Sequence, residues 1–69
     1  MNNYRAILIG VPDLERPVQI FGSHLSNMAT WAKEISLKYP RVKYPEARVK
    51  VYGIEEILVV EWVDGEGKE

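Results

Sequence analysis

The sequence contains no cysteine and a single histidine, His24. Without cysteine the chain forms neither a disulfide nor a thiolate metal site, and a Cys–His catalytic pair is excluded. A single histidine also argues against a histidine-rich zinc site. We therefore expect no metal, no cofactor and a location in a reducing compartment, with the cytoplasm as the default.

Long hydrophobic runs are lacking as well. The run of apolar or glycine residues at positions 6–12 is seven residues long, whereas a membrane span needs about 18–20 apolar residues. The N-terminal segment does not have the pattern of a signal peptide. The sequence therefore predicts a soluble protein with no membrane segment.

Catalytic motifs are sparse. Gly10 and Gly22 stand alone, so the chain has no glycine-rich phosphate loop. His24 has two serines nearby, but a Ser–His pair within one helical turn lacks an orienting acid and an oxyanion hole. Glu55 and Glu56 would point to opposite faces of a strand and so would not form an acid–base pair. We expect no enzymatic activity.

The chain is short enough for its core to be small. It has 69 residues, 46% of them hydrophobic, which indicates one folded domain. A chain of this length buries about 60% of the surface that its unfolded form exposes. Its core is expected to supply no more than about 3–5 kcal/mol of stability. With disulfides and thiolate metal sites excluded, self-association is the remaining common source of stability.

Residues 23–39 organise the chain, because their spacing predicts a helix. Apolar residues recur every three or four positions and share one helical face. This stripe consists of Leu25, Met28, Ala29, Ala32, Ile35 and Tyr39. Trp31 is expected on its flank. Ser23 or Ser26 is the expected N-cap, and Pro40 ends the helix because it disfavours helical backbone at the preceding residue.

Four segments have the length and composition of strands, namely residues 4–11, 17–21, 46–52 and 55–63. The order β-β-α-β-β predicts a two-layer α+β domain, with one helix packed on a four-stranded, mainly antiparallel sheet. We expect residues 1–69 to form a single small domain. Residues 64–69 are rich in glycine and acidic residues and are expected to form a flexible acidic tail.

The predicted sheet has apolar side chains on both faces. The helix is expected to cover Ala47, Val49 and Val51 of the third strand and Leu58, Val60 and Trp62 of the fourth. For the first strand the pattern does not decide which face is inward. One of its two apolar sets is therefore left uncovered, together with alternate residues of the last strand.

An uncovered apolar sheet face predicts a homodimer, formed face to face or by pairing of edge strands. The expected interface residues are Ile7, Ile9, Val11, Ile57, Val59 and Val63. The alternative is that the chain covers this face itself, with the loop 12–17, which carries Leu14, or with the loop 40–45.

Charge is divided unevenly along the chain. Residues 38–52 carry five cations and one carboxylate, whereas residues 53–69 carry six carboxylates and one lysine. Arg48, Lys50 and Tyr52 would share one face of the third strand, where cations could contact phosphates and the ring could stack on a base. The alternative is that these cations pair with Glu55, Glu56 or Glu61 of the neighbouring strand, and the pI of 5.8 favours this alternative.

The two tryptophans also have two interpretations. Trp31 and Trp62 are either core rings or anchors of an interface. Taken together, the sequence predicts a small non-enzymatic interaction module that self-associates through an apolar sheet face. The first alternative is a nucleic-acid-binding module that uses strand 47–52. The second is an enzyme or ligand-binding subunit whose site forms between protomers.

Overall fold

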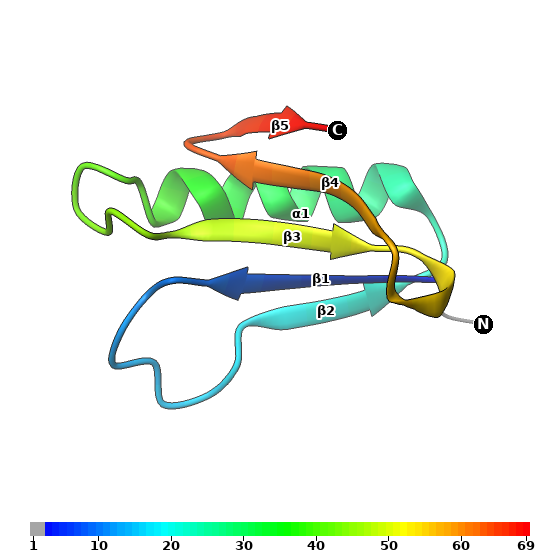
Figure 1. Ribbon diagram of the computed structural model, residues 1–69, viewed down its shortest axis with the longest axis horizontal. Coiled ribbons are helices and arrows are strands. Elements are labelled where there is room, and N and C mark those ends of the chain that lie inside the picture. The colour runs from blue at the N-terminus through cyan, green and yellow to red at the C-terminus, as the bar shows by residue number, and fades with distance from the viewer. Residues whose placement is uncertain (1–2) are drawn as a thin grey trace.

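The computed structural model describes residues 3–69 as five antiparallel strands with one helix on one side of the sheet (Figure 1). The elements are β1 (Tyr4–Ile9), β2 (Gln19–Gly22), α1 (Leu25–Lys38), β3 (Arg48–Tyr52), a short 3₁₀ turn η1 (Ile54–Glu56), β4 (Leu58–Val63) and β5 (Glu66–Lys68). The strand order is β2-β1-β3-β4-β5. The predicted two-layer α+β architecture is confirmed, with five strands instead of four.

The fifth strand forms because an Asp-Gly turn reverses the chain after β4. Asp64 and Gly65 both have positive φ, 51° and 81°, the backbone of a tight hairpin turn that Asp-Gly adopts readily. The segment Glu66–Lys68 then pairs with β4. Residues 64–69, predicted as an acidic tail, thus contain a turn and a short edge strand.

The same turn is attached to the end of α1. The Gly65 N–H donates to Ser36 Oγ at 2.8 Å, and the Ser36 hydroxyl donates to the Lys33 carbonyl at 3.0 Å. The Arg41 N–H donates to Asp64 Oδ1 at 2.8 Å. Ser36 is 2% exposed, so a buried hydroxyl links the last turn of the helix to the β4–β5 hairpin.

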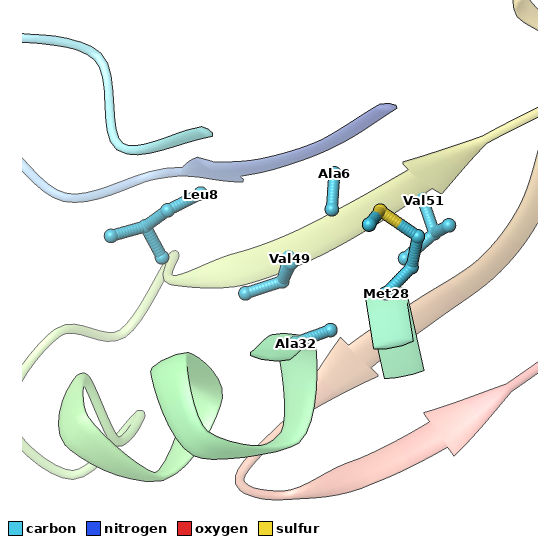
Figure 2. Packing of buried hydrophobic residues seen from close by; sticks show 6 residues of the cluster. All are labelled: Ala6, Leu8, Met28, Ala32, Val49 and Val51. Atoms are coloured by element: carbon cyan, nitrogen blue, oxygen red, sulfur yellow. The ribbon is translucent and has the colours of Figure 1, made fainter. Parts of the chain in front are cut away.

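The core lies between α1 and the central strands β1 and β3. It consists of Ala6, Leu8, Met28, Ala32, Val49 and Val51. Side chains of α1 point toward those of β1 and β3 (Figure 2). The inward set predicted for the third strand is confirmed, since Ala47, Val49 and Val51 are buried. The sequence pattern did not decide which face of the first strand is inward. The structure shows that Ala6 and Leu8 of β1 point inward.

The fourth strand departs from the predicted alternation at its start. Val60 and Trp62 pack against the core, but Leu58 is 47% exposed. The pairing register shifts by one residue, so that Val51 lies opposite Val60 whereas Tyr52 lies opposite Leu58. A β-bulge therefore turns Leu58 away from the core, and its predicted inward position is wrong.

The helix is shorter than predicted and begins at a different cap. Its N-cap is His24, which has an extended backbone and makes no side-chain capping hydrogen bond, so the expectation of Ser23 or Ser26 is wrong. The buried positions are Met28, Ala32 and Ser36, whereas Leu25 is 38% exposed. With 14 residues in α1, no helix within residues 3–69 is long and apolar enough to cross a membrane.

We expect Ser36→Ala to lower the free energy of unfolding by about 1–3 kcal/mol, because the Gly65 N–H would lose its acceptor in a buried place. Urea denaturation at one fixed protein concentration measures the change. Ser26→Ala is the matched control, since Ser26 is exposed in the same helix, and it should change stability by less than about 0.5 kcal/mol. Equal effects of the two substitutions would contradict a role for the buried link.

Candidate functional site

The sheet face that points away from α1, named here the open face, is the candidate site. Its residues alternate with the inward ones and are joined by the strand register. They are Gln19 and Phe21 of β2; Arg5, Ile7 and Ile9 of β1; Arg48, Lys50 and Tyr52 of β3; Leu58, Val59, Glu61 and Val63 of β4; and Glu66 and Lys68 of β5. Figure 1 looks onto this face, with α1 behind the strands.

Neither loop that could have covered the open face does so. Leu14, in the connection between β1 and β2, packs against the core. Val42, in the connection between α1 and β3, is 96% exposed, and that connection lies beyond the end of the strands (Figure 1). Within residues 3–69 the open face is therefore uncovered.

A row of five side chains, one from each strand, crosses the middle of the open face. Ile7 lies between Gln19 and Lys50, Lys50 lies opposite Glu61, and Glu61 lies opposite Lys68. Side chains directly opposite on antiparallel strands are near neighbours. The charges in this row alternate in sign from β3 to β5, so each has an opposite charge beside it.

A second row lies toward the ends of β1 and β3. Arg5 lies between Phe21 and Tyr52, with its guanidinium carbon 4.8 Å from the centre of the Tyr52 ring. Its Nη2 donates to Glu56 Oε2 at 3.1 Å. Phe21, at the edge, is 54% exposed. The Tyr52 ring is therefore already stacked against a cation of its own chain.

Arg48 is compensated by two carboxylates. Its guanidinium lies 3.6 Å from Glu61 and 3.8 Å from Glu46. The pairing of Arg48 with Glu61 is the cross-strand alternative that the sequence offered. Arg48, Lys50 and Tyr52 do share one face as predicted, but two of the three are engaged within the chain, which weakens this face as a site for phosphates.

Of the six predicted interface residues, four lie on the open face: Ile7, Ile9, Val59 and Val63. All four are half-buried. Val11 instead packs against the core, because Gly10 has a φ of 80° and ends the alternation of β1. Ile57 is 62% exposed in the connection before β4.

The β4–β5 half of the open face is hollowed. The hollow has a volume of about 620 Å³, and its apolar lining is Leu58, Val59, Val60 and Val63. Its polar lining is Arg41, Glu61, Asp64, Glu66, Lys68 and Glu69. A twisted two-stranded hairpin produces such a concave surface, and the surplus of carboxylates makes this half acidic.

The residues searched for catalysis are dispersed. His24 is exposed at the start of α1. Glu55 and Glu56 lie in η1 with positive φ, 66° and 59°, and not in a strand as predicted, because the turn is closed by a hydrogen bond from the Gly53 N–H to the Ile57 carbonyl. Among residues 3–69 no group of three or more His, Asp or Glu side chains is placed to hold a metal ion.

Both tryptophans pack against the core and are half-buried. The Trp62 ring lies against Gly67 of β5, where an added Cβ would come within 2.7 Å of it. Gly67 thus makes room for the ring, an arrangement in which an aromatic side chain covers a glycine on the neighbouring strand. The core interpretation of the tryptophans fits these positions.

Comparison of the chain with protein-family models, with curated proteins and with solved structures finds no match. A function must therefore be argued from the open face itself.

We expect the protein to bind a fluorescent single-stranded oligonucleotide only weakly, with a Kd above about 100 μM at 150 mM salt. The reason is that carboxylates compensate Arg48 and Arg5 on the face that would contact the phosphates. Fluorescence anisotropy measures the binding. Tight, salt-dependent binding that Arg48→Glu with Lys50→Glu abolishes would contradict this expectation and favour the nucleic-acid function.

Proposed function

We propose that the protein is a small non-enzymatic interaction module that forms a homodimer through its open face. The observation that supports this proposal is the uncovered second face of the sheet, since α1 packs on the opposite face. A two-layer domain of 69 residues has a small core, and a second copy supplies a further layer without any added chain.

The apolar part of the interface comes from β1 and β4, which lie on either side of the central strand β3. Ile7 and Ile9 of β1 and Val59 and Val63 of β4 are half-buried in one protomer and become fully buried when a second sheet packs on them. Complete burial of such a side chain is worth about 1.5–3 kcal/mol relative to exposure. The gain for four residues, each already half covered, is a substantial addition to a core of this size.

Face-to-face packing is favoured over pairing of edge strands. The edge strands are short, with four residues in β2 and three in β5. Short edge strands offer few unpaired backbone groups to another chain. The open face, in contrast, spans all five strands and combines apolar side chains on β1 and β4 with charged side chains on β3 and β5.

The cytoplasm is part of the same proposal. A chain without cysteine gains nothing from an oxidising compartment, and the dimer takes the stabilising role that disulfides have in small secreted domains.

We expect sedimentation velocity to detect a reversible dimer of the 7.9 kDa chain at micromolar concentrations. The double variant Ile7→Thr, Val63→Thr should raise the dimer Kd at least about tenfold, because it removes apolar area from the interface and keeps β-branched side chains in both strands. Far-UV circular dichroism verifies that the variant remains folded.

Val42→Thr is the matched control, because Val42 is 96% exposed away from the open face. It should leave the dimer Kd unchanged. A single 7.9 kDa species at every concentration, or equal effects of the control and the double variant, would overturn the proposed dimer.

A further inference from the structure

Charge on the open face changes sign from one side of the sheet to the other. The cations Arg5, Arg48 and Lys50 lie on β1 and β3, whereas Glu61 and Glu66 lie on β4 and β5. Lys68, which also lies on β5, is a cation within this acidic half. The boundary between the basic and the acidic half therefore runs along the strands, between β3 and β4.

When two sheets pack face to face in a twofold dimer, the twofold axis lies in the plane of the interface. It can run either perpendicular or parallel to the strands, and the two directions give different contacts. An axis perpendicular to the strands places each strand over the same strand of the partner, so that like charges face each other. An axis parallel to the strands exchanges the two halves of the face. When it runs between β3 and β4, the basic half of each protomer covers the acidic half of the other.

We infer, on the basis of the proposed dimer, that the twofold axis runs parallel to the strands between β3 and β4, so that Lys50 of each protomer faces the partner subunit's Glu61. Lys50 and Glu61 are opposite each other in the β3–β4 register and hence at the same height along the strands. Rotation about an axis parallel to the strands preserves this height. The two residues thus meet without any adjustment of register.

The surroundings of this pair accommodate the arrangement. Glu61 lies 3.6 Å from Arg48 of its own chain, and a carboxylate has acceptor sites for a further cation. The same axis places Tyr52 over the partner subunit's Leu58, because these two are also opposite in the register. The strand axes of the two sheets are then parallel to each other, which corresponds to the aligned type of sheet packing.

Charged pairs of this kind determine orientation more than affinity. Under this axis the register places Ile7 over the partner subunit's Lys68, Ile9 over the partner subunit's Glu66 and Val63 over the partner subunit's Arg48. The aliphatic stems of these charged residues cover the apolar side chains, and the charges select one of the two possible axes. This division makes the orientation testable separately from the existence of the dimer.

The test is reversal of one charge at a time, with the dimer Kd measured by sedimentation velocity. In Lys50→Glu, the new carboxylate would face the partner subunit's Glu61, and in Glu61→Lys the new ammonium would face the partner subunit's Lys50. Each single variant should have a Kd raised at least about tenfold. An equimolar mixture of the two variants should form a heterodimer with a Kd near that of the natural chain.

The mixture separates contacts between subunits from contacts within one. Each variant chain keeps its like-charged pair across β3 and β4 in the mixture, so recovery of association there must come from the partner. Lys33→Glu and Glu15→Lys are matched controls, because both residues are exposed and neither belongs to the strands of the open face, and they should leave the Kd unchanged.

An axis perpendicular to the strands gives a different result. Lys50 would then face the partner subunit's Lys50, so reversal in both copies would leave the homodimer Kd unchanged and the mixture would associate more tightly than the natural chain. That outcome would overturn the inferred axis and leave the dimer standing. A natural chain that remains monomeric would overturn both.

Discussion

One helix can cover one face of a sheet, and this constraint determines what the molecule presents to its surroundings. α1 contacts all five strands, and small side chains such as Ala6 and Ala32 allow it to lie close to them. The opposite face is left to side chains that must tolerate water when the chain is alone. The mixture found there, with isoleucine and valine between arginine, lysine and glutamate, meets that requirement and still offers apolar area to a partner.

The architecture could be predicted from the sequence because it depends on the regular spacing of apolar residues along the helix and the strands. The alternation of Ala47, Val49 and Val51 has one reasonable arrangement, and the structure has it. The stripe of α1 is found in its central part, with Met28 and Ala32 buried, whereas Leu25 is exposed. The fifth strand could also have been predicted, since Asp64-Gly65 between Val63 and Glu66 is a strong hairpin signal. The prediction of a flexible tail rests on the glycine and acidic residues of this segment, which also favour disorder.

Other features could not be read from periodicity. A bulge changes which way Leu58 points, and nothing in a run of apolar residues marks where an extra residue will be inserted. Ser36 is buried because the hairpin turn brings the Gly65 N–H to it across 29 positions of sequence. The ion pairs that compensate Arg48 likewise depend on the register between strands, which the sequence did not specify. For the same reason the candidate site emerged as a mixed surface and not as the apolar patch expected.

The sheet consists of two parts, each made of strands that follow one another in the sequence. β1 and β2 form one hairpin, and β3, β4 and β5 form a meander of consecutive strands. Their junction, the pairing of β1 with β3, is the one contact between neighbouring strands that bridges the whole length of α1. Closing a long loop costs more entropy than forming a hairpin. The helix packs against both parts and so holds this pairing together, and we expect the β1–β3 pairing to be the slow, non-local step when the chain folds.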